Sequence, residues 1–233
     1  MVAVPRTGPR ATPVESALRP CRDIAERPMA FLFTDLRHST ALYERMGDVA
    51  AYEIVRCHFA FLAGIVLGHD GLVVKTIGDA VMAAFGNPAD AVKAALDVQA
   101  RIIDFNRTHA EGDDGHLAIR VGVHSGDSIR VEFAGGLDYF WSAVNLTARL
   151  RSRSRDGDVV LSQVVAEHPV VRLLLATMPT RRESLPFKGF DGLVRFVRVM
   201  PAIKRSTGDD VPLAMTVRHS ARTPRACLAL GGR

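Results

Sequence analysis

The stretch MAFLFTDLRHST, residues 29–40, joins a buried strand to the first turn of a helix through one acidic residue. Its first five residues are apolar, which is typical of a strand buried on both faces. Asp35 ends this strand. A second apolar stretch, LVVKTIGDAVMAAF at residues 72–85, predicts two strands with Asp79 in the turn between them. The sequence therefore predicts adjacent strands that each carry an aspartate at a turn.

Hydrophobic spacing predicts the remaining helices and strands. The predicted helices lie at Ser39 to about Gly68 with a break at Gly47-Asp48, at Asn87-Pro88 to His109, at 142–153 and at 163–175. The predicted strands lie at 29–35, 72–77, 80–85, 117–124, 128–133, 159–161, 181–187 and 193–199. We expect 128–133 to pair with 117–124. Helices between strands, together with tight hairpins, indicate an α+β fold with helices on one face of a mixed sheet.

The 233 residues suit one domain with irregular ends. Residues 1–27 lack periodicity and are expected to be a flexible lead-in, 28–200 the folded domain, and 201–233 a basic, disordered tail. The net charge of +5 lies in the ends, since the first 28 residues carry a net +2 and the last 33 a net +4. The folded part is left at about −1, which predicts no nucleic-acid partner.

The cysteines and the apolar segments bear on location. Cys21, Cys57 and Cys227 are odd in number and lack metal-ligand spacing, which indicates a reduced, cytoplasmic protein. The best candidate for a membrane span, residues 59–68, is too short, so we expect no span. The first thirty residues contain no apolar signal-peptide core.

Asp35 and Asp79 are candidate metal ligands. Mg²⁺ and Mn²⁺ prefer oxygen ligands and often bind one or two carboxylates plus substrate phosphates. The helix start after Asp35 offers main-chain N–H groups to phosphate oxygens. Aspartate is also common in turns and helix caps, so spacing alone leaves both interpretations equally open.

Two pairs of polar residues could bind a nucleotide. Asn145 and Arg149 lie four residues apart on a predicted helix and share one face, although most such arginines are simply solvated. Lys75 lies inside an apolar strand and must reach solvent, a carboxylate or a ligand. Asp138 follows two glycines, where a turn acid is the simpler interpretation.

Other reactive residues carry less information. His124 ends a predicted strand, where a packing or hydrogen-bonding role is favoured over a catalytic base. No serine or cysteine has the partners of a nucleophile, and no glycine-rich loop of the Walker or dinucleotide type is present. Hydrolase chemistry is therefore disfavoured.

Taken together, five segments resemble the class III nucleotide cyclase catalytic domain of the bacterial adenylate cyclase type. They occur in the family's order over about residues 29–200: Phe33-Thr34-Asp35-Leu36 with Ser39-Thr40, Lys75 to Met82, Gly122 to Gly126, Asp138-Tyr139-Phe140, and Val144 to Leu150. The resemblance implies a ferredoxin-like (βαββαβ) α+β domain, with helices packed on a mixed, mostly antiparallel sheet. It also implies an adenylate cyclase in signal transduction, which converts ATP to 3′,5′-cyclic AMP and pyrophosphate.

The resemblance implies a role for each candidate residue. Asp35 and Asp79 would bind two Mg²⁺ or Mn²⁺ ions per site, with the Leu36 carbonyl as a further ligand. The implied phosphate contacts are the main-chain amides of Arg37, His38, Ser39 and Thr40, and the side chain of Lys188.

The implied nucleotide contacts come from the other pairs. Lys75 and Asp138 match the pair that reads adenine, which favours ATP over GTP. Asn145 would orient the ribose, and Arg149 would stabilise charge on the α-phosphate in the transition state.

In this family the metal aspartates and the base-reading, Asn and Arg residues of one site come from opposite chains. The resemblance therefore implies a head-to-tail homodimer with two shared sites and an inactive monomer.

Three positions depart from the family's usual residues, and they define the competing hypotheses. His38 and Trp141 stand where glycine is common, and Thr147 where alanine is common. The main hypothesis is an active adenylate cyclase. Because of these departures, the alternative hypothesis is a catalytically weak nucleotide-binding or dimerising regulatory domain of the same fold. A third hypothesis, a diguanylate cyclase, ranks last because Gly135 to Asp138 lacks that family's paired acids.

Overall fold

The structure of the chain is a computed structural model, and it describes residues 18–20, 28–109, 115–133, 136–140, 142–155 and 157–201. The expected tail at 201–233, apart from its first residue, and most of the expected lead-in at 1–27 lie outside these residues.

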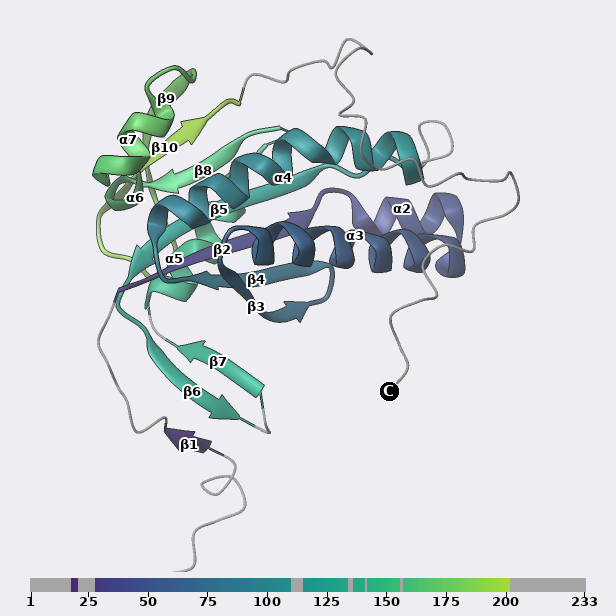
Figure 1. The fold of residues 1–233 in the computed structure, drawn as a ribbon, viewed down its shortest axis with the longest axis horizontal. Helices are drawn as coiled ribbons and strands as arrows, with labels where there is room; N and C mark the ends of the chain where they lie inside the picture. The colour runs from purple at the N-terminus through teal and green to yellow at the C-terminus, as the bar shows by residue number, and fades with distance from the viewer. Residues whose placement is uncertain are drawn as a thin grey trace, which may run out of the picture.

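A seven-stranded sheet forms the centre of the molecule. Its strands are β2 (Met29–Leu36), β3 (Gly71–Ile77), β4 (Ala80–Phe85), β5 (Ile119–Gly126), β8 (Val159–Ser162), β9 (Thr180–Pro186) and β10 (Leu193–Val199). They run in the order β3-β4-β2-β5-β8-β10-β9 (Figure 1). All neighbours pair antiparallel except β5 and β8, which are parallel. The prediction of a mixed, mostly antiparallel sheet is confirmed.

Helices pack on both faces of this sheet. The helices are α2 (Ser39–Met46), α3 (Asp48–Gly68), α4 (Pro88–His109), α5 (Ser142–Arg151), α6 (Gln163–Glu167) and α7 (Pro169–Leu175). One face, here called the helical face, packs against side chains from α3, α4, α6 and α7, among them Leu62, Val92, Val165 and Val171. The opposite face packs against α5, through Phe31 and Ala143. We call it the α5 face.

The prediction that helices cover one face was therefore wrong for α5. Successive residues of a strand point to opposite faces. In β2, Leu32 faces the helical side and Phe31 the α5 side, and both are buried. A strand that is apolar throughout needs cover on both faces.

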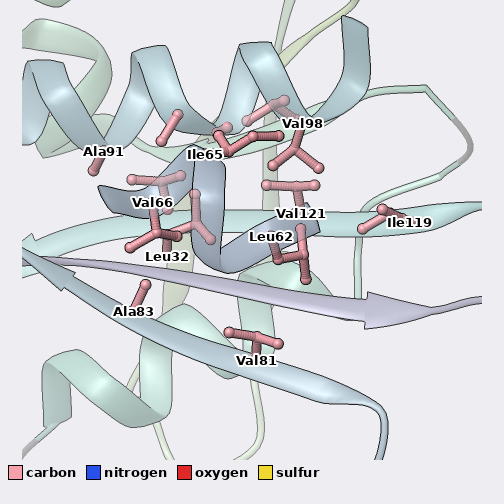
Figure 2. Close-up of a cluster of buried hydrophobic side chains, with 14 of the residues drawn as sticks. Leu32, Leu62, Ile65, Val66, Val81, Ala83, Ala91, Val98, Ile119 and Val121 are labelled. Atoms are coloured by element: carbon pink, nitrogen blue, oxygen red, sulfur yellow. The ribbon is translucent and has the colours of Figure 1, made fainter. Parts of the chain in front are cut away.

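The main core lies between the sheet and the helical face. Figure 2 shows side chains of β2, β4 and β5 meeting those of α3 and α4, including Leu32, Val81, Val121, Leu62, Ile65, Val66 and Val98. Burial of each such aliphatic side chain contributes roughly 1.5–3 kcal/mol. This core fixes β2 and β4, which carry or flank the two aspartates.

Two predicted helices are divided at residues that cannot continue them. Gly47, with φ 77°, separates α2 from α3, and its N–H donates to the Tyr43 carbonyl. The break predicted at Gly47 is confirmed. The single helix predicted at 163–175 is instead α6 and α7, because Pro169 lacks an N–H and begins a new helix.

A separate three-stranded sheet contains β1 (Leu18–Pro20), β6 (Ile129–Phe133) and β7 (Gly136–Phe140), in the order β1-β6-β7. The prediction that 128–133 pairs with 117–124 was wrong, since β6 pairs with β1 and β7. Neither β7 nor β1, which falls within the expected lead-in, was predicted.

Helix α3 is longer and more apolar than the segment 59–68 considered from the sequence. Within the described residues it is the one helix that could cross a membrane by length and composition, with a mean hydropathy of 1.5. Core helices of soluble proteins pass the same test, and α3 buries Leu62, Ile65 and Val66 in the main core. The absence of a span stays a prediction.

Candidate active site

Asp35 and Asp79 lie at the same end of the β2–β4 pair. Thr34 is opposite Val81, so Asp35 lies beside the β3–β4 turn that contains Asp79. Gly78 in this turn has φ 62°, a left-handed conformation that glycine adopts without strain. The structure therefore brings the two aspartates together on neighbouring strands.

Two arginines that the sequence analysis did not single out flank Asp35. Arg120 lies directly opposite it in the β2–β5 pairing, with Nη1 3.8 Å from Oδ2. Arg151, the last residue of α5, has Nη1 3.3 Å from Oδ1. Burial raises the pKa of Asp35; Arg151 opposes this rise, Asp79 adds to it, and Arg120 opposes it. The net rise means that the guanidinium groups do not fully compensate the buried acids.

Asp79 has an unsatisfied oxygen. Its Oδ2 is buried and has no hydrogen-bond partner among the described residues. A buried carboxylate oxygen without a partner is costly, and a hard divalent cation would satisfy it. The described residues contain no group of three His, Cys, Asp or Glu side chains able to hold a metal. The two carboxylates therefore fit Mg²⁺ or Mn²⁺ if main chain, water or phosphate oxygens complete the shell.

Gly122 explains how Arg151 reaches Asp35. A Cβ atom at Gly122 would lie 2.3 Å from the main-chain nitrogen of Arg151 and 2.7 Å from its Cα. Only glycine allows this approach of α5 to β5. Gly122, the first residue of the segment Gly122 to Gly126, therefore sets how closely α5 packs on the sheet.

The segment after Asp35 offers main-chain donors. The side chain of Leu36 is buried, so only its main chain could reach a ligand. His38 adopts φ 57° and ψ 33° and begins α2 without a side-chain cap, which leaves the first N–H groups of the helix, at Ser39 and Thr40, without a capping side chain. Histidine tolerates this left-handed conformation better than most residues do. Arg37 differs from the prediction, because its N–H donates to the Ala118 carbonyl at 2.8 Å.

Lys75 and Asp138 form an ion pair. Nζ of Lys75 on β3 lies 2.6 Å from Oδ2 of Asp138 on β7. The Asp138 Oδ1 atom accepts a hydrogen bond from the Tyr139 N–H, and the Phe140 ring centroid is 6.0 Å from Nζ. The pair joins the two sheets on the α5 face. The ion pair therefore holds the Lys75 ammonium group and the Asp138 carboxylate beside the Phe140 ring. The ammonium group could donate a hydrogen bond to a planar base, and the carboxylate could accept one from it.

Asn145 and Arg149 are exposed on α5, and neither makes a side-chain hydrogen bond to another described residue. Residues two apart on a helix face different sides, so Arg149 points away from the side from which Arg151 reaches Asp35. Within one chain, no hydrogen bond or ion pair joins Asn145, Arg149 or the exposed Lys188 to the two aspartates among the described residues. Trp141 lies outside the described residues.

His124 and Thr147 have partners that explain them. His124 Nδ1 lies 2.8 Å from Ser162 Oγ, and burial lowers the pKa of His124 to about 4. This is the hydrogen-bonding role predicted for it. The buried Thr147 hydroxyl donates to the Ala143 carbonyl at 2.7 Å, so this hydroxyl is satisfied within α5.

The sequence matches the family described as the adenylate and guanylate cyclase catalytic domain over residues 25–190. The chain belongs to this family, and the resemblance found in the sequence is confirmed.

The curated relatives include adenylate cyclases of protozoa and fungi. The chain is 27% identical to the receptor-type adenylate cyclase GRESAG 4.2 of Trypanosoma brucei brucei over 170 residues, 58% of this chain and 30% of that protein. It is 28% identical to an adenylate cyclase of Mycosarcoma maydis over 181 residues, 70% of this chain and 7% of that protein. The match thus covers less than a third of either relative.

The fold is similar to those of solved cyclases. The adenylyl cyclase CyaB from P. aeruginosa superposes with a TM-score of 0.66 at 22% identity, over 74% of this chain and 93% of that one. The guanylyl cyclase Cya2 gives 0.67 at 19% identity, over 78% and 95%. The fold is thus shared with a solved adenylyl cyclase and with a solved guanylyl cyclase.

Proposed function

We propose that the chain is an adenylate cyclase that converts ATP to 3′,5′-cyclic AMP and pyrophosphate. The observation that carries the proposal is the pair Asp35 and Asp79 at one end of the sheet, with a buried oxygen on Asp79 that has no hydrogen-bond partner among the described residues. Such a pair suits the two divalent ions that the reaction needs near the triphosphate.

The choice of ATP rests on Lys75 and Asp138. The ammonium group can donate to a ring nitrogen of adenine, and the carboxylate can accept from the exocyclic amine. Their separation of 2.6 Å supports a shared task at one base. The relatives named adenylate cyclases support the same choice.

In the proposed reaction the ribose 3′-hydroxyl attacks the α-phosphorus in line, and pyrophosphate leaves. Mg²⁺ or Mn²⁺ bound by Asp35 and Asp79 would acidify the hydroxyl and neutralise phosphate charge. The amides of His38, Ser39 and Thr40 would hold phosphate oxygens at the start of α2. Asn145 would orient the ribose, Arg149 would stabilise the charge that develops on the α-phosphate, and Lys188 would contact the triphosphate.

The proposal includes a homodimer. Arg149 and Asn145 are exposed, and neither forms a hydrogen bond or ion pair with the aspartates of its own chain among the described residues. A two-fold axis would bring them to the aspartates of a second chain and create two equivalent sites.

A second candidate is a nucleotide-binding regulatory domain of the same fold with low turnover. The contact of Arg151 with Asp35 at 3.3 Å favours it, because a cation already occupies one metal-facing oxygen. Binding of ATP and Mn²⁺ without product would support this candidate over the first.

The main test is a cyclase assay of the purified chain with ATP and with GTP, under Mg²⁺ and under Mn²⁺. We expect cyclic AMP from ATP and little product from GTP. Asp35→Ala should reduce the rate more than about 100-fold, since even outer partners of metal ligands are worth 10–100-fold. Asp104→Ala, an exposed aspartate on α4, is the control and should keep its activity. Unchanged activity in Asp35→Ala would refute the metal assignment.

A complementation test addresses the shared sites. Asp79→Ala and Arg149→Ala chains should each be inactive, and their heterodimer should contain one intact site. Random mixing should restore about a quarter of the native activity, because half the dimers are mixed and each has one good site. Mixtures that form heterodimers but stay inactive would contradict the shared arrangement.

A further inference from the structure

A cleft of about 680 Å³ lies on the helical face at the β9 edge of the sheet, between α6, α7 and the β9–β10 pair. Two strands, β5 and β8, separate β10 from β2, and the cleft opens on the face opposite Asp35. Figure 1 shows α6 and α7 packed beside β8–β10, at the other end of the molecule from α2. The cleft is therefore remote from the candidate active site.

Three arginines from three elements line this cleft: Arg172 on α7, Arg182 on β9 and Arg195 on β10. The strand register explains two of them. Arg182 is opposite Val197 and Arg195 is opposite Ser184, and Val197 is part of the helical-face core. Residues directly opposite each other share a face, so the side chains of Arg182, Ser184 and Arg195 all point to the cleft.

These arginines lack acidic partners among the described residues. None of the three makes an ion pair or side-chain hydrogen bond there, whereas most other arginines of the sheet do. Glu183 borders the cleft, but it is opposite Phe196 and accepts from Arg198 on the other face. The hydrogen bond from Arg198, together with the charges of Arg198, Arg181 and Arg155, lowers the pKa of Glu183.

The remaining acid does not balance the charge. Glu167 on α6 accepts a hydrogen bond from Gln163 at 2.6 Å and is exposed. Three guanidinium groups thus face one carboxylate, which leaves about two positive charges in the cleft. The lining also offers donors from Gln163 and Ser184, and its apolar side chains are those of Ala166 and Val197.

We infer that this cleft binds an oligophosphate, either inorganic or the phosphate chain of a nucleotide. Guanidinium groups bind phosphate oxygens through paired N–H donors, and several arginines around one space favour a ligand with several negative charges. The volume falls within the roughly 300–1,000 Å³ range of small-molecule sites. A single carboxylate ligand would leave positive charge uncompensated.

The test measures binding of inorganic triphosphate to the full chain by calorimetry, in EDTA and at 150 mM salt. Without divalent metal, the Asp35 site gives little binding to a triphosphate, and the Asp35→Ala chain should bind it as well as the native chain does. We expect Arg182→Ala and Arg195→Ala each to weaken binding about tenfold, since a hydrogen bond to a charged group contributes about 1.5 kcal/mol or more.

Arg181→Ala is the matched control. Arg181 precedes Arg182 on the same strand, is 69% exposed and lies 4.0 Å from Glu183 on the other face. Its loss should change affinity less than about twofold, because only a general charge effect remains. Far-UV circular dichroism checks that each variant is folded.

Several results would overturn the inference. They are the absence of triphosphate binding, equal loss in Arg181→Ala and Arg182→Ala, and loss of binding in Asp35→Ala. Tighter binding of a hexaglutamate peptide than of triphosphate would make the cleft a protein-docking surface instead. Competition by ATP and by inorganic triphosphate distinguishes the two sources of phosphate, since a nucleotide site should favour ATP.

Discussion

Two ion-pair clusters in this chain differ in how completely their charges are satisfied. Arg198 pairs with Asp158 and donates from Nε to Glu183 at 2.8 Å and from Nη1 to the Arg153 carbonyl at 3.0 Å. Ser154 and the Arg155 N–H also donate to Asp158. This cluster is closed, and it joins the loop that follows α5 to β9 and β10.

The cluster around Asp35 is open. Its ion pairs with Arg151 and Arg120 are longer, at 3.3 and 3.8 Å, and burial raises the pKa of Asp35. One oxygen of Asp79 and the Nε of Arg151 are buried without hydrogen-bond partners among the described residues. Similar residue types thus build a structural cluster where every group is paired and a candidate site where some are not.

The largest expected effect concerns the closed cluster. Arg198→Met should lower the free energy of unfolding by about 3–5 kcal/mol, because it leaves Asp158 buried without its cation. Urea denaturation monitored by circular dichroism measures it. Arg181→Met is the control at an exposed ion pair and should change stability by less than about 0.5 kcal/mol. A loss below about 1 kcal/mol for Arg198→Met would break the comparison.

A second prediction tests whether missing partners alone mark a functional site. His58 is fully buried in the main core, both its ring nitrogens lack partners among the described residues, and its ring packs near Phe61 and Phe105. Burial lowers the pKa of His58 to about 4. The unfolded chain therefore takes up a proton near pH 6.5 while the folded chain does not, so stability should fall as the pH drops from about 6.5 to about 4.

This contribution amounts to roughly 2–3 kcal/mol for one ring. His58→Phe should remove it and leave stability at pH 7 unchanged or higher, since the variant buries no unpaired nitrogen. His124, whose pKa is also lowered to about 4, keeps its own contribution in both chains, so the difference between their pH profiles isolates His58. Identical profiles from pH 4 to 7 would contradict the prediction.

The smallest expected effect concerns the open cluster. Arg151→Gln should increase the affinity of the nucleotide-free chain for Mn²⁺ about fivefold, because it removes a positive charge beside Asp35 worth about 1 kcal/mol. Electron paramagnetic resonance of free Mn²⁺ measures the affinity. Arg153→Gln is the control, since this guanidinium lies 5.3 Å from the Phe187 ring instead. Weaker Mn²⁺ binding in Arg151→Gln would mean that Arg151 supports the metal site.

Much of the fold could be predicted from the sequence. The strand at 29–35, the hairpin around Asp79, the break at Gly47 and the long helix ending at His109 follow from local spacing, glycine and proline. The pairing of β6 with β1 was missed because it joins residues more than a hundred positions apart, which periodicity does not report. The pairing of β6 with β7 is local, since Phe133 is opposite Gly136, and the glycines at 135 and 136 were its signal in the sequence.

The candidate site divides in the same way. Asp35 and Asp79 could be found because each ends or interrupts an apolar strand. Arg120 lies within the predicted strand 117–124, two residues before the segment Gly122 to Gly126, but its position opposite Asp35 depends on the β2–β5 register. Arg151 gave no comparable signal, since its position depends on how closely α5 approaches β5.

The sequence by itself determined where most of the strands and helices form, where several of them end, and which family the chain belongs to. These properties are local, since side-chain periodicity and backbone preferences act over a few residues. The tertiary structure decided which charges are satisfied: it joined Lys75 to Asp138 across 63 residues and set two arginines beside Asp35. It left one oxygen of Asp79 and the arginines of the β9–β10 cleft without partners among the described residues. The physical reason is that charge compensation depends on distances of a few ångströms between distant segments, and only strand register and helix packing fix those distances.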